Sequence, residues 1–152
     1  MASIQKRIAL GFIVAAISVL TFHQAMWELL HYLALPGLGM PPPFPTEPVP
    51  PFGVPRIASL CFWGGVWGAA FGAVWRGPRA SLWWAGLLLG VVAALTGLFV
   101  VAAIKGQPIG GVWVLTNWVR SLLINGFWGL GVGLMLSALP GATVARRQYG
   151  YR

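Results

Sequence analysis

Charged side chains are scarce in this sequence. They make up 8% of its 152 residues, and only two of them, Glu28 and Glu47, are acidic. A soluble domain has about 25% charged residues, so this chain has too few polar groups to cover a globular surface. Its hydrophobic share of 58% excludes a disordered chain. Its single cysteine, Cys61, excludes a secreted disulfide scaffold. A polytopic membrane protein is the class that fits.

Four apolar runs are each long enough to cross a bilayer as a helix, which takes about 20 residues. They cover residues 8–35, 57–75, 81–104 and 112–139. The runs are continuous, whereas the strands of a membrane barrel alternate polar and apolar residues. The first run is too long for a signal peptide and is expected to be retained. We therefore predict an all-α fold, a bundle of four transmembrane helices forming a single membrane domain over residues 1–152.

The basic residues predict how the bundle is oriented. With the N-terminus in the cytoplasm, seven of ten basic residues fall on the cytoplasmic side: Lys6, Arg7, Arg76, Arg79, Arg146, Arg147 and Arg152. Arg56 and Lys105 fall outside, and Arg120 lies within a span. The positive-inside rule then places both termini in the cytoplasm, with residues 140–152 as a basic tail. We interpret the net charge of +8 as favouring contact with anionic membrane lipids, and we expect no nucleic-acid partner.

Residues 36–55 contain nine of the twelve prolines. Proline lacks an N–H group and has a fixed φ, which disfavours both a helix and a paired strand. Polyproline II structure or turns are therefore expected. The predicted orientation makes this segment an outer loop that covers the bundle as a stiff strap.

Glycines recur every four residues in the second and fourth runs. At this spacing they form a smooth stripe on a helix, along which two backbones can touch in lipid. The stripes predict close helix packing at Gly64, Gly68, Gly72, Gly129 and Gly133. The partner could be another helix of the chain or a second copy, and the first is favoured.

Polar side chains gather in the first and last runs, where they are energetically unfavourable and are usually retained for a function. They are His23, Gln24, Glu28 and His31 in the first run, and Asn117, Arg120 and Asn125 in the fourth. At 1.5 Å per residue, Glu28 lies about 10 Å and Arg120 about 12 Å below the predicted outer helix ends. The intramembrane acid and arginine therefore share one level, which predicts a Glu28–Arg120 ion pair.

Two interpretations of these polar residues stay open. They could form a clamp between the first and last helices. They could instead line an outward-facing pocket beneath the proline-rich loop, in which Glu28 and the histidines titrate or bind a ligand. The pocket predicts transport or binding of a small solute, ion or proton. The alternative function is an accessory or assembly subunit of a larger membrane complex, respiratory or photosynthetic, and a homo-oligomer also fits.

Cofactor and enzyme sites have little support. Glu28-Leu29-Leu30-His31 matches the Glu-x-x-His element of di-iron bundles, which need two such elements and further carboxylates. Haem or a metal at His23 and His31 is the remaining alternative. The spans offer no third histidine for bis-His haem, and these two are about 12 Å apart along the helix. No serine or cysteine is paired with a histidine and an acid. We predict no cofactor and a non-enzymatic function.

Several short stretches suggest a relationship to known sequences: Phe22-His23-Gln24, Leu30-His31, Phe52-Gly53-Val54-Pro55, Phe62-Trp63-Gly64-Gly65, Lys105-Gly106-Gln107-Pro108 and Asn125-Gly126-Phe127-Trp128-Gly129. With these stretches the chain resembles a group of small proteobacterial inner-membrane proteins that have four helices and no established activity. The resemblance covers nearly the whole chain. It implies a multi-pass protein of the bacterial inner membrane and carries over no functional residue.

Overall fold

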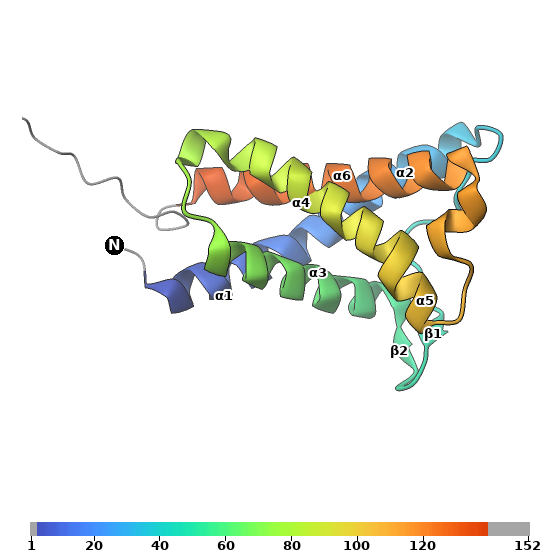
Figure 1. Ribbon diagram of the computed structural model, residues 1–152, viewed down its shortest axis with the longest axis horizontal. Coiled ribbons are helices and arrows are strands. Elements are labelled where there is room, and N and C mark those ends of the chain that lie inside the picture. Colours follow the sequence, from blue (N-terminus) through green and yellow to red (C-terminus); the bar gives the residue numbers. More distant parts are fainter. Residues whose placement is uncertain (1–2, 140–152) are drawn as a thin grey trace, which may run out of the picture.

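The computed structural model describes residues 3–139; residues 1–2 and the predicted basic tail, residues 140–152, lie outside the described part. The described part is helical apart from its loops and one short strand pair (Figure 1). Four of its helices are long and apolar enough to cross a membrane: Ile4–Leu33, Arg56–Val74, Arg79–Ile104 and Leu115–Ala138. The prediction of an all-helical chain with four membrane-length helices is therefore confirmed. The observed helix ends differ from the predicted ones by at most four residues.

The first membrane-length helix is interrupted near its middle. It begins as α1 (Ile4–Ser18), continues through a π-helical segment, Val19–His23, and ends as α2 (Gln24–Leu33). It starts earlier than predicted because the Ser3 hydroxyl caps it, accepting a hydrogen bond from the Lys6 N–H at 3.2 Å. The second membrane-length helix is the uninterrupted α3 (Arg56–Val74).

The third membrane-length helix has a second π-helical segment. After a 3-10 turn at Arg79–Ser81 it consists of α4 (Leu82–Thr96), π-helical Gly97–Val101 and α5 (Ala102–Ile104). The fourth is α6 (Leu115–Ala138). π-Helical turns are rare in proteins overall, but those that occur are often at functional sites. The two segments therefore mark candidate positions for a functional site.

The helices pack as two pairs, α1 with α3 and α4 with α6 (Figure 1). Glycine brings the backbones of the first pair into contact. A Cβ atom at Gly68 would overlap the carbonyl group of Gly11, and one at Gly72 would overlap the carbonyl group of Arg7. Gly64 faces the side chain of Val19 instead, at 2.7 Å from the ideal Cβ position to Cγ2. The predicted stripe of α3 therefore lies against α1 within the same chain.

The second pair is built from glycines on both helices. A Cβ atom at Gly86 of α4 would overlap the carbonyl group of Gly129 in α6, and one at Gly129 would overlap that of Gly86. Gly90 and Gly133 approach the backbone of the opposite helix in the same way. The glycine stripes predicted from the sequence included Gly129 and Gly133 of α6 but not Gly86 and Gly90 of α4.

The two pairs are joined in the core by α1 and α6. The Trp128 indole N–H donates to the carbonyl oxygen of Ala15 at 3.0 Å, and the Ser18 hydroxyl donates to the carbonyl oxygen of Trp128 at 2.8 Å. Trp128 is only 2% exposed, whereas Trp63, in the similar Phe-Trp-Gly stretch of α3, is 60% exposed. The two stretches therefore have different structural roles.

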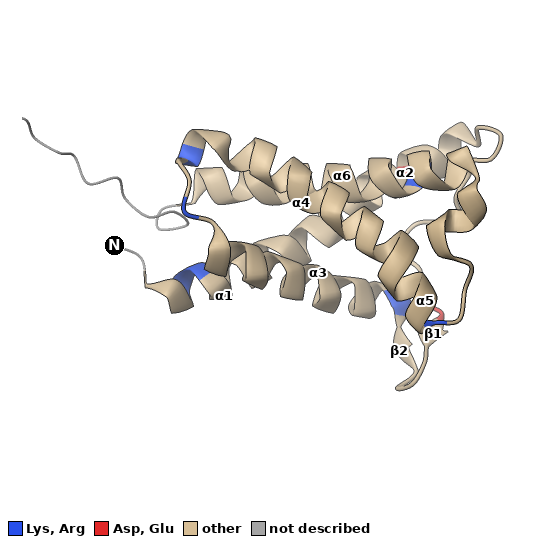
Figure 2. Cartoon of the chain, viewed as in Figure 1, with Lys and Arg blue, Asp and Glu red and all other residues tan. Residues whose placement is uncertain are grey.

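Basic residues gather at the two ends of the bundle (Figure 2). The end where the chain begins carries Lys6, Arg7, Arg76 and Arg79. The opposite end, called the loop end below, carries residues 34–55 and 105–114 (Figure 1). At the loop end Arg56 forms a salt bridge with Glu47, with 2.9 Å between Nε and Oε1.

Arg7 is not a surface charge, although it belongs to this basic end. It is 4% exposed, and its guanidinium group donates to the carbonyl oxygens of Ala73 at 2.9 Å and Trp75 at 3.0 Å. The last carbonyl groups of a helix lack partners within the helix and carry partial negative charge. Arg7 therefore caps the C-terminal end of α3 and ties it to α1.

The proline-rich loop contains a strand pair, which the sequence analysis predicted against. β1 (Pro48–Val49) and β2 (Val54–Pro55) are antiparallel, with Pro48 opposite Pro55. The hydrogen bond beside this proline pair runs from the Arg56 N–H to the Glu47 carbonyl oxygen, at 3.0 Å. Pro48 and Pro55 occupy positions at which the strand pair requires no backbone N–H donor. Their missing N–H groups therefore do not prevent the two strands from pairing.

Candidate functional site

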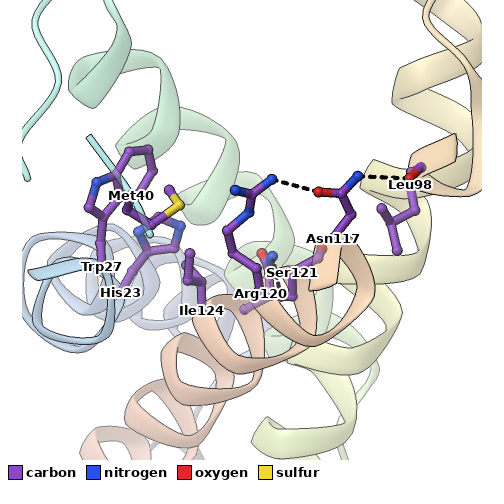
Figure 3. A pocket seen from close by; sticks show the side chains of 10 residues that line it. His23, Trp27, Met40, Leu98, Asn117, Arg120, Ser121 and Ile124 are labelled. Atoms are coloured by element: carbon purple, nitrogen blue, oxygen red, sulfur yellow. Dashed lines mark hydrogen bonds between the residues drawn. The ribbon is translucent and has the colours of Figure 1, made fainter. Parts of the chain in front are cut away.

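A cavity of about 350 Å³ lies toward the loop end, between the first, third and fourth membrane-length helices (Figure 3). It is lined by polar and apolar side chains: His23, Trp27, Met40, Leu98, Gly111, Asn117, Arg120, Ser121, Ile124 and Asn125. His23 ends one π-helical segment and Leu98 belongs to the other. Both interruptions of the helices therefore contribute to the wall of this one cavity.

Four of the seven predicted ligand-binding residues line the cavity, namely His23, Asn117, Arg120 and Asn125. The other three, Gln24, Glu28 and His31, are not in its wall. Residues 120, 121, 124 and 125 share one face of α6 because positions three and four apart are neighbours on a helix. Six lining residues were not predicted: Trp27, Met40, Leu98, Gly111, Ser121 and Ile124. Five of them are apolar and gave no signal of a polar site, and serine is too common in helix packing for Ser121 to stand out.

Arg120 is held by an amide that is itself fixed to the backbone. Its Nη2 donates to Oδ1 of Asn117 at 2.8 Å, and Nδ2 of Asn117 donates to the carbonyl oxygen of Gly111 at 2.8 Å. Nδ2 of Asn125 donates to the carbonyl oxygen of Ser121 at 2.9 Å. Figure 3 shows the Arg120 guanidinium group between Asn117 and the side chains of His23 and Met40. The arginine is therefore oriented by hydrogen bonds and directed into the cavity.

The predicted Glu28–Arg120 ion pair is wrong. Within residues 3–139 the salt bridge is the one between Glu47 and Arg56, and Glu28 is exposed. Counting residues from the helix ends fixes the depth of a side chain but not the direction in which it points. Trp27 points inward, and the next residue along a helix is rotated by about 100°, which turns Glu28 away from the cavity.

Three side chains of α2 hold the proline-rich loop, and we call them the loop clasp: Gln24, Trp27 and His31. Oε1 of Gln24 accepts the Phe44 N–H at 2.7 Å. The Trp27 indole donates to the Pro41 carbonyl oxygen at 2.8 Å, and Nδ1 of His31 donates to that of Met40 at 2.8 Å. Loop carbonyl groups need donors when they are removed from water. Trp27 and His31 supply such donors, Gln24 supplies an acceptor to the loop N–H, and the His31 bond holds Met40 at the cavity.

The same contacts define the hydrogen position on His23, which is 7% exposed. Because Oε1 of Gln24 is turned toward the Phe44 N–H, its Nε2 faces Nδ1 of His23, at 3.3 Å. An amide NH₂ group can only donate, so Nδ1 is the acceptor. The His23 ring therefore carries its hydrogen on Nε2 and offers a donor there.

A left-handed turn precedes α6 and supports Asn117. Gly110, Gly111, Val112 and Trp113 all have φ between 57° and 65°. Only glycine adopts this conformation without strain, and a β-branched residue such as Val112 rarely does. Such strain is often found near functional sites. The turn also explains why the fourth helix begins at Leu115 rather than at the predicted residue 112.

The two candidate haem or metal ligands lie in different surroundings. His31 contacts the loop through Nδ1, whereas His23 lies at the cavity. Within residues 3–139, no three His, Cys, Asp or Glu side chains come together in a way that could hold a metal ion. Comparison of the chain with protein-family models, curated proteins and solved structures finds no match.

Proposed function

We propose that this protein binds a small polar solute in an outward-facing pocket, as a step in moving it across the membrane. The observation that carries the proposal is the cavity at the loop end, in which Arg120, Asn117, Asn125 and His23 meet. Such polar groups within apolar spans are unfavourable and are usually retained for a function. A volume of about 350 Å³ suits a small ligand.

The charge distribution supports a location of the loop end outside the cytoplasm. The four basic residues at the opposite end favour the cytoplasm by the positive-inside rule. In this orientation the N- and C-termini are cytoplasmic and the proline-rich loop covers the outer face. The membrane we propose is the bacterial inner membrane, which the resemblance to small proteobacterial proteins implies.

Accessibility of a cysteine in the cavity tests the proposal. Cys61→Ala removes the native thiol, and Ser121→Cys then places a single thiol in the cavity wall. In intact cells, a membrane-impermeant thiol reagent added from outside should label this cysteine, because water fills a solute pocket. The matched control is Ser137→Cys near the other end of α6, which should react only in inside-out vesicles.

Two results would overturn the proposal. A cysteine at position 121 that reacts from neither side would show a dry cavity and therefore a structural clamp. A cysteine that reacts only from the cytoplasmic side would reverse the orientation.

The alternative function, an accessory subunit of a larger complex, has less support from the structure than from the sequence. The predicted glycine stripes pack within the chain, so they are not free to bind another protein. Its docking surface would have to use exposed aromatic side chains such as Phe62 and Trp63, which are 55% and 60% exposed. Purification in a mild detergent followed by mass spectrometry distinguishes the two, because an accessory subunit should retain its complex.

A further inference from the structure

We infer that the ligand of this pocket is an anion with a carboxylate or phosphate-type group, bound by the guanidinium group of Arg120. The inference rests on the proposed function, since it names the chemical class that the pocket selects. It is carried by the charges of the lining, by the acids of the whole chain and by the hydrogen-bond donors that face the cavity.

Arg120 has no side-chain acid with which to pair. The complete sequence contains two acids. Glu47 is paired with Arg56, and Glu28 is exposed and absent from the cavity wall. Arg120 is therefore the one formally charged side chain in the lining. Arginine does not lose its proton in proteins, so the cavity stays positive.

A partly buried positive charge in a membrane needs compensation, because its hydration is incomplete and the surroundings screen it poorly. The oxygen of Asn117 supplies one neutral acceptor to Nη2. No other hydrogen bond of the Arg120 guanidinium is made within residues 3–139. A bound anion supplies the missing negative charge and accepts the remaining N–H groups.

The donors of the cavity favour a planar or tetrahedral oxyanion over a halide. A guanidinium group presents its N–H groups as a flat fork that matches two oxygens of a carboxylate or phosphate. Asn117 fixes the plane of this fork through its own bond to Gly111. His23, also in the wall, adds a donor at Nε2, as its contact with Gln24 requires. The cavity thus combines one cation with at least one neutral donor.

The anionic group could belong to a free solute or to a lipid headgroup. Arg120 lies five residues after the first residue of α6, which is about 8 Å along the helix axis and within reach of an interface. The chemistry is the same for both sources. The experiment therefore needs one arm for each.

The first arm uses the purified chain in a maltoside detergent, titrated with phosphate or acetate against chloride at constant ionic strength. Calorimetry and thermal unfolding should show saturable binding of phosphate or acetate. Arg120→Gln should weaken it about tenfold or more, since a bond to a charged group is lost. Arg120→Lys should be intermediate, because it keeps the charge and loses the fork. The matched control, Arg56→Gln, should bind as the unsubstituted chain does.

The second arm follows phospholipid that remains bound through purification, by native mass spectrometry. If a headgroup is the ligand, the phospholipid should be retained by the chain and by Arg56→Gln and lost from Arg120→Gln. Free phosphate and acetate would then have no effect. Saturable binding of the free anions, without retained lipid, would identify a soluble ligand. Either result supports an anion at Arg120.

A third measurement does not depend on the stability of the Arg120 variants. The cysteine of Ser121→Cys, in the Cys61→Ala chain, is modified with a sulfonate-bearing or an ammonium-bearing methanethiosulfonate. The anionic reagent should react faster, and the ratio of the two rates should fall about tenfold when Arg120 is replaced by Gln. If Arg120→Gln does not fold, the ratio in the parent chain and the binding by Arg120→Lys decide the question.

The anion inference is overturned if neither free anions nor phospholipid bind in a manner that depends on Arg120, or if the two reagents react equally fast. If a cysteine at position 121 still reacts from outside in that case, the proposed pocket stands and only its selectivity for anions is contradicted. If this cysteine is unreactive, both the pocket and the anion selectivity are contradicted.

Discussion

Trp128 shows how a single residue can link two helices inside an apolar bundle. Its indole N–H and its carbonyl oxygen both take part in hydrogen bonds with α1, to Ala15 and from Ser18. These groups are removed from water, and a buried polar group without a partner is strongly unfavourable. The pair of bonds therefore fixes the position of α6 along α1 as well as holding the two helices together.

Replacement of Trp128 by Phe should destabilise the chain by about 1–3 kcal/mol, because it removes the indole donor and leaves a small cavity. Trp63→Phe is the matched control, since Trp63 is exposed, and its effect should stay within about 0.5 kcal/mol. Unfolding in detergent, followed by circular dichroism, measures both. Equal losses would contradict the assignment of Trp128 as the link between α1 and α6.

The glycines of α3 act at the scale of the helix, since they determine how closely it approaches α1. The carbonyl group of Gly11 occupies the space that a side chain at Gly68 would need. Backbone atoms at such a contact cannot move aside as a flexible side chain can. Even one methyl group must therefore force the two helices apart.

Gly68→Ala should lower the free energy of unfolding by about 1–3 kcal/mol or more through overpacking. Gly97→Ala is the control, because Gly97 is also helical and has open space where its Cβ would lie. This control should be neutral or slightly stabilising, since alanine favours a helix more than glycine does. Thermal unfolding in detergent compares the two. A loss at Gly97 as large as that at Gly68 would contradict the close contact of α1 and α3.

The contribution of Gln24 to the loop clasp can be tested by hydrogen exchange at a single backbone amide, that of Phe44. Among residues 41–45, Phe44 alone has a backbone N–H, since the other four are prolines. That N–H donates to Gln24. Gln24→Leu should accelerate hydrogen exchange at Phe44 about five- to tenfold, as expected for one lost hydrogen bond. Mass spectrometry of a peptide covering this segment gives the rate. Glu28→Gln, on the same helix but outside the clasp, should leave the rate unchanged; an unchanged rate in Gln24→Leu would contradict the clasp.

Some structural elements could be predicted from the sequence and others could not. Hydropathy predicted the four membrane-length helices because burial in lipid requires long apolar runs. It missed the left-handed turn before α6 because Val112 and Trp113 are as apolar as the helix that follows. Counting of residues placed Arg120 at a polar level but failed for Glu28, whose direction depends on helix rotation. Gln24 and His31 were recognised as polar residues with a role, yet their partners lie in a loop that no helical pattern describes.

At the scale of the whole molecule, two glycine-packed helix pairs leave room for polar groups at the loop end. The pairs are joined in the core by Trp128 and Ser18, and the cavity lies beyond this contact toward the proline-rich loop. The loop clasp holds the loop in place and brings Met40 to the cavity wall. The molecule thus combines a close-packed half with a half that contains π-helical segments, a strained turn and a tethered loop.

The central claim, that the cavity is open to water from the outer side, is tested most directly by a cysteine scan along α6. Each residue from 116 to 127 is replaced by Cys in the Cys61→Ala chain, and an impermeant reagent is applied to intact cells. Labelling is expected at the positions that line the cavity, 117, 120, 121, 124 and 125, and none is expected at the lipid-facing position 123. If no position is labelled, or if the labelled positions do not follow this helical pattern, the result would contradict an outward-facing pocket.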